Sequence, residues 1–383
     1  MTPAARVQAA AEILDRILSG APAEQALVNW ARSSRFAGSG DRAAVRDHVF
    51  DALRQRRSFA ALGGGETGRG LMLGLVRALG LDEGALFSGQ AHALAPVQPG
   101  EEGRPPTKAE ALDLPDWLIP RFEQSLGDQA TAIAQAMKTR APVFLRANLS
   151  RAPLEKGIAA LAAEGIVARP HPLAPTALEV TEGQRKIQTS QAYAGGMVEL
   201  QDASSQAVVQ ALPLSKGMKV LDYCAGGGGK TLAMADRMPL SLFAHDADPR
   251  RMADLPARAK RAGAKVTLTQ TPQKTAPYDL VLIDVPCSGS GSWRRDPSGK
   301  WRITPEHLQD LARVQSDILD QTARMVRPNG VLAYATCSLL AEENHDRISG
   351  FLARTPGWRL DMQRQFTPLE EGDGFYIALM TRD

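Results

Sequence analysis

Two of the three cysteines in this chain lie in short polar segments that have the composition of a reactive site. Residues 284–291 read Asp-Val-Pro-Cys-Ser-Gly-Ser-Gly, and residues 336–338, about fifty positions later, read Thr-Cys-Ser. Cys287 and Cys337 each follow an apolar run and have small or polar neighbours, unlike a cysteine buried in a core. Because a thiolate is a strong nucleophile, this pattern predicts covalent catalysis in which two thiols act on one substrate.

A glycine-rich turn precedes these segments. Residues 222–231 read Asp-Tyr-Cys-Ala-Gly-Gly-Gly-Gly-Lys-Thr, directly after an apolar pair. Glycines at such a turn let the backbone approach a ligand at a helix N-terminus. A P-loop requires glycine where Cys224 stands, and a dinucleotide G-x-G-x-x-G motif beginning at Gly226 requires it where Thr231 stands. Both tests fail, so the turn is not predicted to hold a phosphate chain.

A second acid indicates what the turn could bind. Asp246 ends the next apolar run, where a carboxylate can accept hydrogen bonds from ribose hydroxyls. S-adenosylmethionine contains a ribose but no phosphate, so it fits a site without a cationic cradle. The alternative is that the glycines only make a tight turn.

The elements that must position these residues are short apolar runs alternating with helical segments. The runs span residues 220–221, 242–244, 280–283 and 331–335, and each ends at one of the polar groups described above. Buried runs joined by helices predict an α/β fold with a doubly wound, Rossmann-like parallel sheet. Ligands of such sheets bind at the carboxyl ends of the strands.

Three other segments precede this domain, which we place at residues 201–383. Residues 1–94 carry helical apolar stripes and predict an all-helical bundle. Residues 95–110 are rich in Pro, Gly and Glu and predict a linker. Residues 111–200 mix helical and strand-like patterns and predict a small α+β module.

The bulk composition fits a cytoplasmic protein of two or three domains. The chain has 383 residues, 44% hydrophobic residues, a net charge of +3 and a mean hydropathy of -0.22. We expect no membrane span, no signal peptide and a reducing compartment, because the three cysteines form no disulfide framework and no C-x-x-C metal pair. Basic clusters at residues 54–57, 250–265 and 294–302 are compatible with contacts to phosphates.

With these motifs in place, the chain resembles the Sun/Fmu-type RNA cytosine-5 methyltransferases, a family that includes a bacterial small-subunit ribosomal RNA enzyme. The similar segments are Gln-Asp-Ala-Ser-Ser at 201–205, the glycine turn with Lys230-Thr231, the Asp-x-Pro-Cys-Ser-Gly block with Arg-Arg-Asp-Pro at 294–297, and Thr-Cys-Ser with Glu-Glu-Asn at 342–344. They occur in the expected order across the whole C-terminal domain.

The resemblance implies roles for four residues. Carbon 5 of cytosine is a poor nucleophile, so a thiolate first adds to carbon 6, and the proton at carbon 5 is removed after methylation. Cys337 would be the nucleophile, and Cys287 would help to remove that proton and release the product. Asp284 would bond to the edge of the base and support protonation at ring nitrogen 3, with Lys230 beside it.

The resemblance also implies S-adenosylmethionine as cofactor. Family members place an acid that contacts adenine between the second strand and the Asp-x-Pro-Cys strand, but residues 267–272 of this chain contain none. Gln270 or a backbone amide would have to replace it. Cys224 is included in the site through its place in the turn, although its side chain fits a small buried apolar residue. The expected cofactor-binding residues are Asp222, Cys224, Ala225, Gly226, Gly227, Gly228, Gly229, Lys230, Asp246, Arg251, Gln270 and Asp284.

The expected partner is RNA, in the first place ribosomal RNA. The helical bundle resembles the antitermination-factor-like RNA-binding domain found in front of some of these enzymes, and the middle module resembles the family's small RNA-recognition-like insertion. We expect a monomer without metal. The alternative function is a non-catalytic RNA-binding or ribosome-assembly factor with an idle methyltransferase domain, which the missing acid would favour. A nucleotide hydrolase, an amino-group methyltransferase and a DNA cytosine-5 methyltransferase fit the motifs less well.

Overall fold

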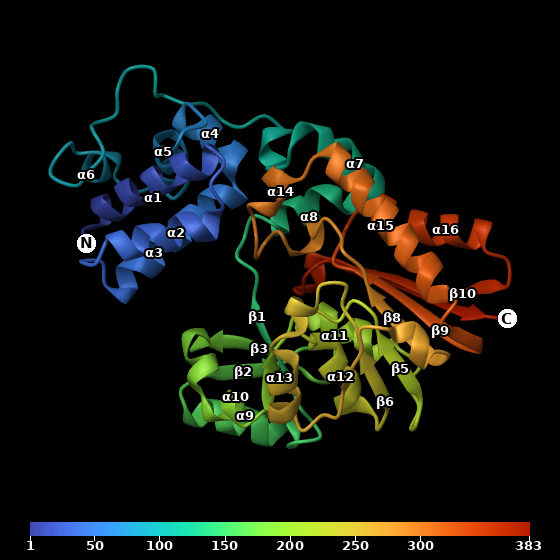
Figure 1. Cartoon of the computed structure of the whole chain (residues 1–383). Helices are drawn as coiled ribbons and strands as arrows, with labels where there is room; N and C mark the ends of the chain where they lie inside the picture. The colour runs from blue at the N-terminus through green and yellow to red at the C-terminus, as the bar shows by residue number, and fades with distance from the viewer. The chain divides into compact units, whose positions relative to one another are not determined.

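The computed structural model describes residues 1–383 and divides into two compact units. Residues Met1–Arg140 and Trp293–Ile303 form the first, here called the helical unit. Residues Ala141–Ser292 and Thr304–Asp383 form the second, here called the sheet unit (Figure 1). The boundaries at residues 94, 110 and 200 follow composition and stay a prediction. No helix of the chain is both long and apolar enough to cross a membrane.

The helices of the helical unit up to residue 87 pack around one apolar core that includes Leu14, Val49 and Leu71. Two helices cross closely at glycines, since a Cβ added at Gly63 or Gly74 would collide with backbone of the facing helix. The α-helices are α1 Pro3–Leu18, α2 Ala23–Ser33, α3 Ser39–Arg54, α4 Arg56–Gly63, α5 Gly68–Ala78, α6 Glu83–Leu86, α7 Ile119–Leu126, α8 Ala130–Ala136 and α14 Gly299–Arg302. The 3-10 helices are η1 Glu110–Leu112, η2 Asp116–Leu118 and η3 Gly127–Gln129.

The first part of the sheet unit is a four-stranded antiparallel sheet in the order β2-β3-β1-β4. Leu145, Leu161 and Leu178 lie in its core. Its elements are β1 Val143–Ala147, α9 Leu154–Ala163, β2 Val167–Pro170, β3 Ala177–Glu182, η4 Gln184–Thr189, α10 Gln191–Ala194 and β4 Val198–Leu200.

The second part is a seven-stranded sheet in the order β10-β11-β9-β8-β5-β6-β7. Strands β7, β6, β5, β8 and β9 are parallel, and β10 and β11 are antiparallel at one edge. The strands are β5 Lys219–Asp222, β6 Ser241–Ala244, β7 Thr267–Leu268, β8 Tyr278–Asp284, β9 Val326–Thr336, β10 Trp358–Phe366 and β11 Phe375–Arg382. The helices are α11 Ala203–Gln210, α12 Gly229–Arg237, η5 Pro249–Met252, α13 Leu255–Ala262, η6 Pro272–Thr275, η7 Ser290–Ser292, α15 Pro305–Ala323, η8 Ala341–Glu343, α16 His345–Arg354 and η9 Pro368–Glu370.

Both faces of this large sheet are buried, as a doubly wound fold requires. Leu280 and Leu282 of β8 pack in a cluster with residues of α11 and α12. Val281 and Ile283, which alternate with them, pack in a second cluster with residues of α15 and α16. The predicted α/β fold with a Rossmann-like sheet and a helical N-terminal region is therefore confirmed.

The sheet also explains why the reactive segments meet. Strand β8 lies between β5 and β9, all three running in the same direction, and Asp222 pairs with Leu282 while Asp284 pairs with Ala335. The carboxyl ends of the three strands therefore reach one edge of the sheet.

Candidate active site

The two cysteines lie side by side at the carboxyl edge of the large sheet. Cys287 is three residues beyond the end of β8, and Cys337 follows β9 directly. Their Sγ atoms are 3.3 Å apart, close enough for one thiol to donate a hydrogen bond to the other sulfur. Both side chains are partly accessible, so the pair is not sealed in the core.

A partly buried ion pair lies at the end of β8, between Asp284 and Lys230. Lys230, in the first turn of α12, places its Nζ 2.7 Å from Oδ2 of Asp284 and 4.9 Å from the centre of the Phe375 ring. Burial lowers the pKa of Lys230, but the charge and hydrogen bond of Asp284, with the charges of Cys337 and Asp222, together raise it, so the pKa lies above its usual value. Lys230 therefore remains a cation, and Oδ1 of Asp284 is left to bond to another group.

Asp222 ends β5 and is almost completely buried. Its Oδ2 accepts a hydrogen bond of 2.6 Å from the Thr231 hydroxyl, whereas Oδ1 has no hydrogen-bond partner. Burial raises the pKa of Asp222 to about 7, against the opposing effect of the Thr231 hydrogen bond. An unpartnered buried oxygen at this place fits a ligand that brings a donor.

The glycine turn requires glycine at specific positions. Gly226 and Gly228 have φ values of +50° and +80°, which side chains other than glycine rarely adopt. A Cβ at Gly228 would also collide with the side chain of Leu255. The turn therefore leads into the N-terminus of α12, and Gly227 is exposed there while its carbonyl accepts a hydrogen bond from Arg258.

Asp246 orders this turn from the end of β6. Its Oδ2 accepts the backbone N–H of Gly226 at 2.9 Å, its Oδ1 accepts that of Asp248 at 3.0 Å, and Arg251 lies 3.3 Å from Oδ2. A carboxylate has about four acceptor positions, so these bonds leave it able to accept ribose hydroxyls as well.

The other residues expected to bind the cofactor lie near the same edge of the sheet. Cys224 and Ala225 lie in the turn with intermediate exposure, and burial raises the pKa of the Cys224 thiol, which therefore stays protonated and unreactive. Gln270 is exposed just beyond β7. Residues 267–272 place no acid there.

A residue without an assigned role stands out in the structure. Glu343 is fully buried beside both cysteine loops, and Gln315 of α15 donates a hydrogen bond of 3.1 Å to it. Glu343 was noticed in the sequence only as part of the Glu-Glu-Asn segment. Its place could not be foreseen because its partners come from three separate segments.

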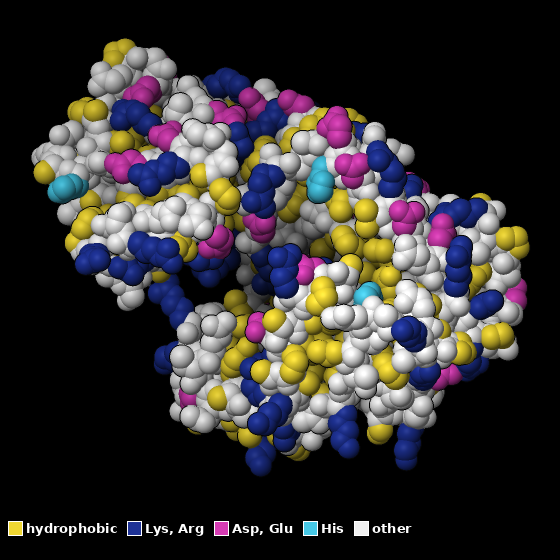
Figure 2. Space-filling view, in the orientation of Figure 1, with side chains coloured by type: hydrophobic (Ala, Val, Ile, Leu, Met, Phe, Trp, Pro, Cys, Tyr) yellow, Lys and Arg dark blue, Asp and Glu magenta, His cyan; other side chains and the backbone are white.

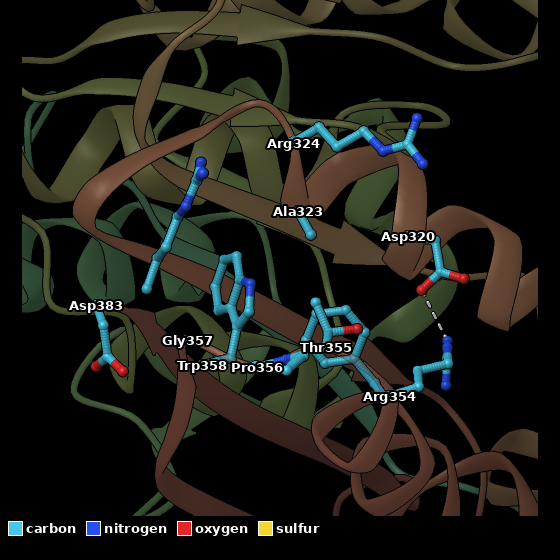
Figure 3. A pocket seen from close by; sticks show the side chains of 11 residues that line it. Asp320, Ala323, Arg324, Arg354, Thr355, Pro356, Gly357, Trp358 and Asp383 are labelled. Carbon is cyan, nitrogen blue, oxygen red and sulfur yellow. Dashed lines mark hydrogen bonds and ion pairs between the residues drawn. The ribbon is translucent and has the colours of Figure 1, made fainter.

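A cavity of about 540 Å³ elsewhere in the sheet unit offers no competing chemistry (Figure 3). Ala323 and Arg324 precede β9, so this cavity lies at the opposite end of that strand from Cys337. Its side chains include Trp358 and the ion pair of Arg354 with Asp320, but no cysteine, histidine or lysine. The cysteine pair therefore remains the candidate reactive site of the large sheet.

Comparison with known proteins is consistent with this site. Residues 209–381 match the family model described as 16S rRNA methyltransferase RsmB/F, and residues 114–186 match an RsmF/B-like ferredoxin-like domain. Over these two regions the chain is similar to the RsmB/F methyltransferase family. This family is S-adenosylmethionine-dependent, which confirms the expected resemblance and cofactor.

The curated RsmB/F relatives extend beyond the matched part. The chain is 34% identical over 284 residues to the ribosomal RNA small subunit methyltransferase B of Klebsiella pneumoniae (strain 342) and to that of Salmonella typhi. Each alignment covers 70% of this chain and 66% of the relative, so slightly less than two thirds of the relative is spanned.

Solved structures show the same fold at lower identity. The crystal structure of PH0851 matches with a TM-score of 0.77 and 23% identity, covering 99% of both chains. The structure of NSun6 from Pyrococcus horikoshii with SFG matches with a TM-score of 0.62 and 19% identity, covering 70% of this chain and 98% of that one.

Proposed function

We propose that this protein transfers a methyl group from S-adenosylmethionine to carbon 5 of a cytosine in small-subunit ribosomal RNA. The observation that carries the proposal is the 3.3 Å separation of the Cys287 and Cys337 sulfurs at adjacent strand ends. The names of the curated relatives support the RNA class. The match of residues 209–381 to the RsmB/F family model supports methyl transfer.

The cofactor site fits the residues present. Bound S-adenosylmethionine would supply the electrophilic methyl group. Oδ1 of Asp222 would accept a hydrogen bond from it, and the backbone of the glycine turn would approach it at the start of α12. Asp246 holds the turn in shape and has acceptor capacity left for hydroxyl groups.

Cys337 would add to carbon 6 of the target cytosine. Asp284 would bond to the edge of the base through Oδ1, because Oδ2 is taken by Lys230. The Lys230 cation stands beside this carboxylate and supplies the positive charge that draws electrons from the ring. The RNA would have to present its cytosine unstacked, at a cost of a few kcal/mol.

Cys287 would become a base only after Cys337 has reacted. The pKa of the Cys287 thiol is raised first by its hydrogen bond with Cys337, then by burial and by the negative charges of Cys337 and Glu343. Addition of the Cys337 sulfur to the base removes that partner. The pKa of Cys287 should then fall, although burial and the Glu343 charge still raise it, and Cys287 would lose its proton to water before it accepts the one from carbon 5.

Separate substitutions of the two cysteines test this mechanism. Cys337→Ala removes the nucleophile, so methylation and any covalent protein–RNA complex should both disappear. Cys287→Ala leaves addition intact and blocks release, so a protein–RNA complex should accumulate that survives denaturing electrophoresis. Cys224→Ala keeps both reactive thiols and should trap no complex. If Cys337→Ala traps RNA and Cys287→Ala does not, the two roles are reversed.

The alternative, an RNA-binding assembly factor with an idle methyltransferase domain, predicts a different result. Titration calorimetry of the wild-type protein with S-adenosylmethionine should show saturable binding if the proposal is right. Undetectable binding, together with retained RNA binding, would favour the alternative.

A further inference from the structure

The two cysteine loops share one buried acceptor, the carboxylate of Glu343. Its Oε1 accepts the backbone N–H of Ser288 at 2.8 Å, and its Oε2 accepts the Ser288 hydroxyl at 2.5 Å. The hydroxyl of Ser338 donates to the same Oε2 at 2.5 Å. Ser288 follows Cys287, and Ser338 follows Cys337. One side chain therefore joins two loops that are fifty residues apart in the sequence.

Glu343 is itself fixed from other elements. Gln315 of α15 donates from Nε2 both to Oε1 of Glu343 at 3.1 Å and to the carbonyl of Pro286 at 2.9 Å. The Tyr334 hydroxyl of β9 donates to the Glu343 carbonyl at 2.5 Å. These bonds restrain both the side chain and the backbone of Glu343, so Glu343 can hold the two cysteine loops in fixed positions.

Linking the two cysteine loops through a buried carboxylate is energetically unfavourable in itself. Burying a charge costs several kcal/mol unless hydrogen bonds compensate for the lost hydration. Apolar side chains of similar volume often stabilise a fold equally well. Here four donor groups converge on one side chain: the Ser288 N–H, the Ser288 and Ser338 hydroxyls, and the Gln315 amide. This arrangement is suited to fixing geometry and charge at the cysteines.

We propose that Glu343 is a positioning residue for the cysteine pair, holding the Cys287 loop against the Cys337 loop and keeping a negative charge beside the Cys287 thiol. The inference rests on the proposed reaction. It adds to that reaction the group that determines which of the two thiols reacts first. With its charge in place, Cys287 keeps its proton until Cys337 has added to the base.

The charge of Glu343 has a measurable consequence. The pKa of the Cys287 thiol is raised first by the hydrogen bond with Cys337, then by burial, and then by the charges of Cys337 and Glu343. Removing the Glu343 charge should therefore lower that pKa. The other charged and titratable groups around the pair are Lys230 from α12, Asp284 from β8, Tyr334 from β9 and Arg347 from α16.

Thiol alkylation in the absence of RNA and cofactor tests the charge. Wild type and Glu343→Gln would be treated with iodoacetamide between pH 6 and 10, and each cysteine would be followed by peptide mass spectrometry. We expect the Cys287 profile of Glu343→Gln to move to lower pH by half a unit or more, which is about threefold in thiolate at a given pH. Cys224 serves as an internal reference, and Glu306→Gln, at an exposed position in α15, is the matched control. A Cys287 profile identical to wild type would overturn the proposal.

Turnover tests the positioning. In Glu343→Gln we expect kcat to fall about 10- to 100-fold with KM nearly unchanged, because small displacements of reacting groups have effects of this size. The fraction of enzyme trapped as a covalent RNA complex should rise, which a loss of folded protein would not cause. If wild type does not methylate RNA, the proposed function fails, while the alkylation result still decides the role of Glu343. If wild type methylates and Glu343→Gln matches it in kcat, the positioning role is wrong.

Two further variants keep the test decisive if Glu343→Gln does not fold. Ser288→Ala and Ser338→Ala each remove one hydroxyl from Glu343 and leave its charge in place. We expect kcat to fall in both variants while the pH profile of Cys287 stays close to that of wild type. Unchanged kcat in both would overturn the proposal.

Discussion

At the scale of single residues, burial determines how the strand-end groups are charged. Asp222 and Lys230 are both buried, but Lys230 has a carboxylate partner and Asp222 has only a hydroxyl on one oxygen. The pKa of Lys230 is therefore raised despite burial, whereas burial raises the pKa of Asp222 to about 7. The first turn of α12 thus carries a permanent charge, and the end of β5 carries a group that titrates.

This difference predicts a pH-dependent stability that originates at Asp222. Its pKa in the folded protein is about 7, above its ordinary value of 3.8, so ionising it in the fold costs free energy as the pH rises through that interval. Asp222→Asn cannot ionise. In the absence of cofactor, its free energy of unfolding relative to wild type should increase by about 1 to 4 kcal/mol between pH 5 and pH 8. Urea unfolding at both pH values measures this, and an equal difference at the two would contradict it.

At the scale of elements, the parallel strands β5, β6, β8 and β9 were predicted from the sequence, whereas β7, β10 and β11 were not. Central strands such as β8 are buried on both faces, so Leu280 to Ile283 form a continuous apolar run. The edge strand β10 alternates exposed and half-buried residues and resembles surface sequence. Strand β9 begins at Val326, well before the predicted run, because Pro328 and Gly330 interrupt the apolar pattern.

Part of the candidate site could also be predicted from the apolar runs of the buried strands. A polar residue after an apolar run indicates the end of a strand. This pattern singled out the two cysteines and Asp284. The role of Glu343 depends on Ser288, Ser338 and Gln315, which no local pattern connects. Side chains that join loops of different strands become visible only once the sheet brings those loops together.

Helices α2 and α3 of the helical unit carry the next prediction. Figure 2 shows Lys and Arg side chains over this region, and Arg32, Arg35 and Arg42 are exposed without an ion pair. If they contact phosphates, changing all three to Gln should reduce the slope of log affinity against log salt for RNA by about 2 to 3. Filter binding at several salt concentrations measures this slope. The control changes Arg354, Arg359 and Arg364, which already pair with acids of the sheet unit and should affect the slope less. Equal effects of the two sets would contradict the prediction.

At the scale of the whole molecule, the chain leaves the sheet unit directly after the Cys287 loop and returns to it at Thr304. The intervening residues 293–303 pack within the helical unit. Arg54 donates to the carbonyl of Arg294 at 2.9 Å, Lys300 donates to the carbonyl of Arg54 at 2.7 Å, and the Trp301 indole donates to the carbonyl of Leu53 at 2.7 Å. The reactive loop is therefore continuous with a segment whose hydrogen bonds are made in the other unit.

Loosening this segment in the full-length protein should expose it to protease. Trp301→Ala removes the indole hydrogen bond and the contact of Trp301 with Arg56, whose guanidinium lies 5.0 Å from the ring centre. Because local opening governs cleavage of folded chains, trypsin should cut within residues 293–303 about tenfold faster than in wild type. Trp117→Ala is the matched control, since Trp117 is also half-buried and also packs against an arginine, Arg121, but lies outside this segment. Mass spectrometry of the first fragments locates the cuts. Equal cleavage of this segment in both variants would mean that Trp301 does not anchor it.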